Sequence, residues 1–244
     1  MKLALAAIGN LNGDIEYNKN KILETIFLYA KKVDLILFGE TFLQGFDSLS
    51  WNYNIDKNIA ISKNDINIIE IMNASKENHV GVSFGYIEKD DDSIYSSQIT
   101  IDKNGKIINN YRRVSNGWKE KCADFHYKEG TGFEVFEFEE KKIVVGLCGD
   151  FWHEENIEKM NNLNKDLIFW PVYTEFNYDE WCNDIKYDYA KQALKFKKPT
   201  LYVNSLPLNI LDEKIAKGGA ALFENGLIIE ELLPGKEEIL IVEI

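Results

Sequence analysis

Residues 34–40 of the chain run Asp-Leu-Ile-Leu-Phe-Gly-Glu. The continuous apolar run 35–38 has the length of a fully buried strand, and a glycine and a glutamate end it. Before this run, apolar residues recur at helical spacing over 15–33, which predicts an amphipathic helix. A second helix is expected over 66–76 and a further strand over 80–88. Strand–helix–strand units of this kind are typical of a layered α/β protein.

The rest of the chain continues this alternation and adds hairpins. Asn-Gly dipeptides at 104–105 and 225–226 are strong turn signals between strand-like runs. Pro171 is expected to stop the strand before it, because proline cannot donate a ladder hydrogen bond. The remaining expected elements are a helix over 185–196 and strands over 2–8, 94–101, 106–110, 133–138, 142–147, 166–170, 200–204, 219–223, 227–232 and 238–243. We therefore predict a mixed sheet system covered by helices.

Charge and composition exclude several classes of protein. Lys and Arg number 28 against 40 Asp and Glu, so the net charge is −12. A nucleic-acid-binding or membrane-surface protein needs a basic face, so we expect neither kind of partner. The hydrophobic fraction of 45% is too high for a disordered chain. Because no linker-like or repeated segment occurs, a single domain over residues 1–244 is predicted.

Cysteine usage and hydropathy indicate a cytoplasmic protein. Cys122, Cys148 and Cys182 are a sparse, odd set, which suits a reducing compartment. No apolar stretch approaches the ~20 residues that a membrane-spanning helix needs. The apolar run at 2–8 is too short for a typical signal peptide and is better interpreted as a buried strand.

Two predicted strands end in reactive side chains. Glu40 follows the run 35–38, and Cys148 follows the run 143–145 between two glycines. The carboxyl ends of strands are where open α/β folds build their sites. The flanking glycines permit a sharp turn, after which a backbone N–H is free to help form an oxyanion hole. Each residue also has an ordinary interpretation, Cys148 as a buried, inert thiol and Glu40 as a helix cap or surface carboxylate.

Four segments, in order, resemble the nitrilase superfamily of carbon–nitrogen hydrolases. The first is 34–40, similar to the family's strand that ends in its catalytic glutamate. The second is the hairpin at 85–106 leading into Tyr111-Arg112-Arg113, which is similar to the family's Tyr-Arg-Lys motif. The third, 146–150, resembles the nucleophile segment, and the fourth, 218–226, resembles the C-terminal Gly-Gly strand and turn. The glutamate and the arginine are 73 residues apart and the cysteine lies 35 further on, which fits the family's layout.

The resemblance implies a four-layer α-β-β-α sandwich, usually assembled as a homodimer or larger homo-oligomer through helices on one face. It implies an amidase-type hydrolase of a small amide or nitrile that needs no metal or organic cofactor. The catalytic residues would be Glu40, Arg113 and Cys148. The thiol attacks the substrate carbon, the glutamate acts as general base, ammonia or an amine leaves, and water hydrolyses the thioester.

The position of the family's catalytic lysine holds Arg113. Arginine keeps the positive charge and can hydrogen-bond an oxyanion, but it is larger, forked and does not deprotonate. Three hypotheses follow. The chain is an active enzyme that uses Arg113, an active enzyme that recruits Lys119 or Lys121, or a catalytically dead module that binds a small molecule or a partner.

Two residues of the segment 115–130 are further candidates. Asp124 falls near the place of a second, often functional glutamate of the family, although a loop carboxylate paired with Lys121 is an equal interpretation. Trp118 is a candidate wall of the substrate pocket or a loop anchor.

Residues after the nucleophile and after the strand over 166–170 are candidate substrate contacts. The family's usual Tyr and Arg are absent after Cys148, where Gly149 and Trp152 stand in an unusual sequence. Tyr173 and Glu175 lie where the family often contacts its substrate, with aromatic packing as the alternative. A Glu175 that faces the pocket would favour a cationic or amine-bearing substrate.

Motifs for other chemistries are incomplete or missing. The Cys–His pairs of the chain lack the third and fourth ligands of a zinc site. The Gly-Gly dipeptide at 218–219 lacks the spacing of a dinucleotide fingerprint, and no G-x-S-x-G is present.

Overall fold

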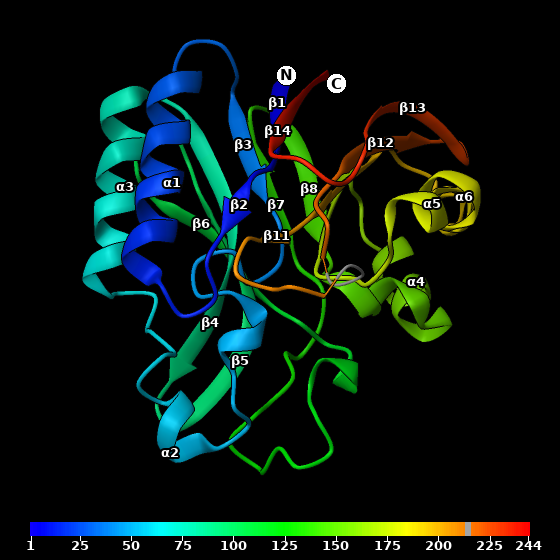
Figure 1. The fold of residues 1–244 in the computed structure, drawn as a ribbon. Coiled ribbons are helices and arrows are strands. Elements are labelled where there is room, and N and C mark those ends of the chain that lie inside the picture. Colours follow the sequence, from blue (N-terminus) through cyan, green and yellow to red (C-terminus); the bar gives the residue numbers. More distant parts are fainter. Residues whose placement is uncertain (213–215) are drawn as a thin grey trace.

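Two six-stranded sheets form the centre of the computed structural model, which describes residues 1–212 and 216–244 (Figure 1). In spatial order the first sheet contains β14 (Glu238–Glu243), β1 (Lys2–Ala7), β3 (Leu35–Phe38), β4 (Gly81–Asp90), β5 (Ser93–Ile101) and β6 (Ile107–Arg112). The second contains β13 (Leu227–Leu232), β12 (Ala220–Glu224), β10 (Thr200–Asn204), β9 (Leu167–Val172), β8 (Lys141–Val145) and β7 (Val135–Phe138).

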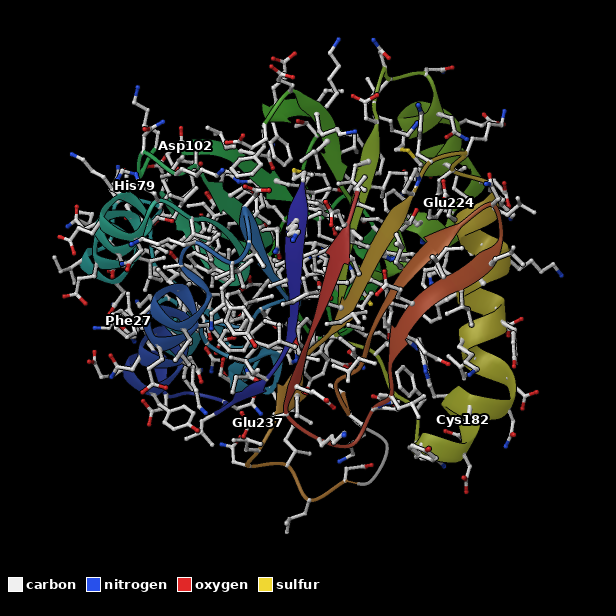
Figure 2. All side chains as sticks on the ribbon, turned by 90° about the horizontal axis from the view of Figure 1, so that it is seen from above. Phe27, His79, Asp102, Cys182, Glu224 and Glu237 are labelled. Carbon is white, nitrogen blue, oxygen red and sulfur yellow. The ribbon has the colours of Figure 1, made fainter. Side chains whose placement is uncertain are left out.

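Helices cover the outer face of each sheet, as the view from above shows (Figure 2). They are α1 (Ile15–Tyr29) and α3 (Ile66–Asn78) on the first sheet, and α4 (Glu154–Asn161) and α6 (Lys186–Leu194) on the second. The short elements are β2 (Gly9–Asn10), which pairs with β11 (Leu206–Pro207), the helices α2 (Tyr53–Asp56) and α5 (Tyr178–Glu180), the π-turn η4 (Trp181–Ile185), and the 3₁₀ turns η1 (Phe46–Ser48), η2 (Asn116–Trp118) and η3 (Cys148–Trp152).

Side-chain alternation along the strands explains the layers. In β1, Leu3 and Leu5 belong to the apolar core between the sheets, whereas Ala4 and Ala6 pack beneath α1 and α3. Strand β9 repeats the pattern, with alternate residues in the inter-sheet core and in the core under α4 and α6. Because both faces are buried, these strands are continuously apolar rather than alternating. Three cores separate four layers, so the predicted α-β-β-α sandwich is confirmed.

Parallel strands at the centre of each sheet bring several chain segments to one edge. Strands β1, β3 and β4 are mutually parallel, as are β8, β9 and β10, and the outer strands of both sheets pair antiparallel. The residues that follow β3 and β8 are therefore placed at carboxyl ends, where α/β folds form sites.

The expected end of a strand before Pro171 is wrong, because β9 continues to Val172. The reason lies in the length of β8, which ends at Val145 opposite Phe169. Beyond that point β9 has no ladder partner on the β8 side. The last bond on that side runs from the Gly146 N–H to the Phe169 carbonyl, so the missing N–H of Pro171 interrupts no pair of the β8–β9 ladder. Pro171 still pairs in register with Val203 of β10 on the other side.

Among the described residues, no helix combines the length and apolar character that crossing a membrane requires.

Candidate active site

Glu40, Arg113 and Cys148 come together at the carboxyl ends of three strands. Glu40 follows β3, Arg113 directly follows β6, and Cys148 follows β8 and begins η3. Arg113 Nη1 donates to Glu40 Oε1 at 2.9 Å, and both charged side chains are buried. The charges of both act on the Cys148 thiol. The structure therefore brings these three sequence-predicted residues together in one place.

The carboxylate of Glu40 is fixed through one oxygen and unpaired at the other. Its Oε1 accepts from Ser96 Oγ at 2.9 Å as well as from Arg113, while Oε2 is buried without a hydrogen-bond partner among the described residues. The backbone is fixed as well, because Ser205 Oγ donates to the Glu40 carbonyl at 2.7 Å. A buried, unpaired carboxylate oxygen is an available proton acceptor.

The guanidinium of Arg113 reaches three groups at once. Nε donates to Ser115 Oγ at 2.9 Å, and Nη1 donates to Glu40. Nη2 makes no hydrogen bond to any residue within 1–212 or 216–244, and a Cβ on residue 149 would lie 2.7 Å from it, so a side chain there would displace the guanidinium. Burial alone would lower the pKa of Arg113, but the negative charges of Glu40, Cys148 and Asp150 together raise it. The residue is a permanent cation with free N–H donors beside Gly149.

The Cys148 thiol sits on a sharp turn. Its φ of 43° lies in the left-handed region, which a non-glycine residue adopts only when the surroundings hold it there. Trp170 Nε1 donates to the Cys148 carbonyl at 2.9 Å, and Sγ donates to the Tyr173 carbonyl at 3.4 Å. Because η3 begins at Cys148, the N–H of Gly149 lies in its first turn, where helical amides have no partner within the helix.

Burial raises the pKa of the Cys148 thiol to about 11, opposed by Arg113 and reinforced by Glu40. The resting thiol is therefore protonated at neutral pH and needs a base for attack. We expect its alkylation by iodoacetamide, followed by peptide mass spectrometry, to rise with pH toward a midpoint near 11. Free N-acetylcysteine in the same reaction is the reference, since an unperturbed thiol titrates near pH ~8.5. A Cys148 midpoint below that of the reference would contradict this electrostatic description.

Asp150 ties the cysteine turn to the arginine segment. One oxygen of its buried carboxylate accepts from the N–H groups of Ser115 at 2.7 Å and Val114 at 3.1 Å. The other accepts from the N–H of Leu147 at 2.8 Å and from the hydroxyl of Tyr111 at 2.6 Å. The geometry between Arg113 and Cys148 thus depends on a residue that contacts neither the thiol nor the guanidinium.

A cavity of about 260 Å³ opens over Arg113 and Cys148. Three of the candidate substrate contacts, Trp118, Tyr173 and Glu175, line it. The full lining is Phe46, Asp47, Leu49, Trp51, Arg113, Gly117, Trp118, Lys119, Glu120, Cys148, Tyr173 and Glu175. Its size is at the lower end for ligand pockets, which favours a small substrate.

Three candidates lie elsewhere. Asp124 is not part of the cavity lining; its carboxylate is half exposed and accepts from the N–H of His126 at 3.0 Å and contacts Nδ1 of that ring at 2.8 Å. Trp152 packs against Trp170 and Tyr189 outside the lining. Lys121 is exposed and also outside the lining.

Lys119 lines the cavity, but its ammonium is already occupied. Nζ donates to the carbonyl of Tyr127 at 3.0 Å and pairs with Glu129 at 2.5 Å. Of the three cations considered for the site, Arg113 is the one bonded to Glu40.

Sequence reasoning missed Ser96, Asp47 and Glu120. Ser96 lies in the middle of strand β5 and donates a hydrogen bond to Glu40. Nothing in the sequence around it distinguishes it from any other serine in a strand. Asp47 lies in the short turn η1 and Glu120 in the loop after η2, and both line the cavity. A loop carboxylate has no spacing that would reveal which way it faces. Within the described residues, no group of three His, Cys, Asp or Glu is placed to hold a metal ion.

The buried carboxylate of Asp56 holds the loop that supplies one wall of the cavity. Its Oδ1 accepts from the N–H of Ser50 at 3.0 Å and the hydroxyl at 2.6 Å. Its Oδ2 accepts from the N–H of Trp51 at 2.9 Å and from Tyr127 Oη at 2.7 Å. The Trp51 ring then packs against Trp118 and Tyr127.

Asp56→Asn is expected to lower the free energy of unfolding by about 2–4 kcal/mol, because its NH₂ group faces donors and leaves at least one unsatisfied. Urea denaturation measures the change. Asp91→Asn, in the exposed turn between β4 and β5, is the matched control, with an expected change below about 0.5 kcal/mol. Equal unfolding midpoints for the two variants would show that the Asp56 network does not hold the loop.

Comparisons with known proteins identify the family of the chain. The family model described as carbon-nitrogen hydrolase matches residues 2–244. The N-carbamoylputrescine amidase of Arabidopsis thaliana is 28% identical over 149 residues, covering 59% of this chain and 49% of the relative. A cyanide hydratase of Botryotinia fuckeliana (strain T4) is 25% identical over 194 residues, covering 70% of this chain and 50% of the relative. The chain spans about half the length of these curated relatives.

The fold is also similar to that of solved structures. An amidase from Nesterenkonia sp. superimposes with a TM-score of 0.77 at 12% identity, covering 100% of this chain and 90% of that chain. These matches confirm the resemblance that the four sequence segments indicated.

Proposed function

The chain belongs to the carbon–nitrogen hydrolase family, and from this premise we propose that it hydrolyses an amide of a small molecule through a thioester on Cys148. The observation that supports the proposal is a thiol and a fixed cation that line one cavity, with the unpaired carboxylate oxygen of Glu40 buried directly behind that cation. An amidase and a cyanide hydratase are both among the relatives. Amide chemistry is favoured because Arg113 Nη2 and the Gly149 N–H suit the oxyanion that attack on a carbonyl creates.

In the first half-reaction, Cys148 Sγ attacks the amide carbon while Glu40 Oε2 takes the thiol proton. The carbonyl electrons move onto oxygen, where Arg113 Nη2 and the Gly149 N–H stabilise the negative charge. Collapse of this tetrahedral species breaks the C–N bond. Glu40 returns its proton to the leaving nitrogen, so ammonia or an amine departs and a thioester remains.

In the second half-reaction, water attacks the thioester. Glu40 takes a proton from the water, a carboxylic acid is released, and the thiol of Cys148 is regenerated with that proton. Arg113 takes no part in proton transfer, because a guanidinium does not deprotonate in a protein. Glu40 therefore serves both half-reactions.

A catalytically dead binding module is the second candidate, and one observation favours it. Arg113 stands where the family has lysine and binds Glu40, the proposed base, at 2.9 Å. The unpaired Oε2 is the reason we place hydrolysis first.

Ammonia release tests the proposal. Purified protein is incubated with pentanamide, 4-aminobutanamide and pentanenitrile, and we expect release from at least one amide that exceeds release from the nitrile. Cys148→Ala should abolish it, whereas Cys122→Ala, which removes an exposed cysteine, should not. No release from any compound by the wild-type protein would support the binding module.

Assembly and location also belong to the proposal. Exposed apolar side chains on α6 and β13, among them Tyr187, Leu194, Leu227 and Ile229, support a homodimer or larger homo-oligomer, which light scattering measures. The three cysteines are free, which supports a reducing, cytoplasmic environment.

A further inference from the structure

We propose, resting on the proposed function, that the substrate carries a positively charged ammonium group at the end remote from its amide, and that Glu120 and Glu175 bind this group. The site so defined is the mouth of the cavity above Arg113 and Cys148.

The charges around the cavity are unbalanced. Its lining includes the carboxylates of Asp47, Glu120 and Glu175 and two cations. Both cations are already paired with carboxylates outside the lining, Arg113 with Glu40 and Lys119 with Glu129. The cavity therefore presents an uncompensated negative potential to anything that enters it.

Two of the carboxylates are unoccupied. Asp47 accepts a hydrogen bond from Tyr173 Oη. Glu120 and Glu175 are exposed, and the side chain of neither makes a hydrogen bond or ion pair within residues 1–212 and 216–244. Their oxygens are free to accept the N–H groups of an ammonium ion.

The walls between these carboxylates are aromatic. Phe46 stacks on Tyr173 with ring centroids 5.1 Å apart, and Trp51 lies 5.8 Å from Trp118. Faces of Phe, Tyr and Trp attract cations, and their apolar edges suit the methylene chain that joins an ammonium group to an amide. An anionic substrate would meet three carboxylates and gain no free cation at the mouth.

An unused donor in the wall also points to a polar ligand. Trp118 is only 3% exposed, and its indole N–H has no acceptor among the described residues. A buried indole N–H without a partner is costly, and a substrate oxygen in the cavity would satisfy it. The cavity wall thus holds an unused donor for a polar group of the ligand as well as acceptors for an ammonium group.

Three amides of matched size test the charge. They are 4-aminobutanamide, which is cationic, pentanamide, which is neutral, and succinamate, which is anionic. For the wild-type protein we expect kcat/KM to fall in this order. The ratio of cationic to neutral substrate should drop roughly tenfold in Glu120→Gln/Glu175→Gln, because exposed charge pairs each contribute a factor of a few. The ratio should also shrink as salt is added.

The control variant Glu77→Gln/Glu158→Gln removes the same charge from two exposed positions outside the cavity and should keep the wild-type ratio. Turnover of pentanamide at least as efficient as that of 4-aminobutanamide would overturn the proposal while leaving the hydrolase function intact. An equal ratio of cationic to neutral turnover in the two double variants would overturn it as well.

A second readout works without turnover. Each amide is added during iodoacetamide labelling of Cys148, and the concentration that protects the thiol by half is measured. We expect 4-aminobutanamide to protect at a lower concentration than pentanamide, with the difference lost in Glu120→Gln/Glu175→Gln. Protection of this kind without ammonia release would uphold the ammonium site and reject the hydrolase. Equal protection by both amides would reject the site.

Discussion

Glu40→Gln is expected to lower kcat/KM for an amide by about 10³-fold, the usual worth of a general base that serves two steps. Oε2 of Glu40 is the oxygen that has no partner, and an amide in its place has no lone pair basic enough to take the thiol proton. Ammonia release measures the loss. Glu134→Gln, an exposed carboxylate outside the cavity, is the matched control and should retain wild-type rates.

The same variant should make Cys148 easier to alkylate. The charge of Glu40 raises the pKa of the thiol, so its removal lowers that pKa and increases the thiolate fraction at any pH below about 11. Arg113→Ala has the opposite sign, because the arginine lowers the pKa of Cys148. Lost turnover together with faster alkylation and an unchanged urea unfolding midpoint distinguishes a missing base from a collapsed site. Slower alkylation in Glu40→Gln would contradict the electrostatic assignment.

Arg113→Ala is expected to lower kcat by about 10³-fold, and Arg113→Lys by roughly 10- to 100-fold. The guanidinium bonds Glu40 through Nη1 and Ser115 through Nε while Nη2 lies beside Gly149. A lysine ammonium has one nitrogen and cannot take the place of all three guanidinium nitrogens. The alanine variant loses the oxyanion donor and leaves the buried Glu40 charge unpaired.

The neighbouring arginine provides the control for this series. Arg112 pairs with Glu88 and Asp90 away from the cavity, so Arg112→Lys should keep near wild-type turnover. If Arg113→Lys instead raised activity, arginine at this position would impair a site that works better with the family's lysine. The binding-module interpretation would then gain the stronger support.

The sequence predicts the layered fold well because the strands are buried on both faces. Continuous apolar runs such as 35–38 and 143–145 can bury the side chains on both faces of a strand only if the strand lies between two other layers. Prediction fails where a local rule depends on a distant strand. Judged from the local sequence, Pro171 should end its strand. Strand β9 nevertheless continues through Pro171, because the β8–β9 ladder ends at Val145 and no pair of that ladder uses an N–H at position 171.

The candidate site divides in the same way. Glu40 and Cys148 are predictable because each directly follows a buried strand, whose end fixes their position. The aperiodic segment 115–130 offers no such anchor. Sequence reasoning nominates Asp124 from the family resemblance and does not single out Glu120, although Glu120 lines the cavity and Asp124 does not. The loop around Trp51 forms one wall of the cavity and is held by the hydrogen bond from the Trp51 N–H to buried Asp56. No local sequence pattern predicts this hydrogen bond.

Acid quenching of the wild-type protein during turnover of 4-aminobutanamide or pentanamide would trap the proposed thioester on Cys148. We predict a peptide containing Cys148 that carries the mass of the substrate's acyl group, that loses this mass on treatment with hydroxylamine, and that is absent from Cys148→Ala. Ammonia release that continues in Cys148→Ala, or acylation of another residue, would contradict the proposed mechanism.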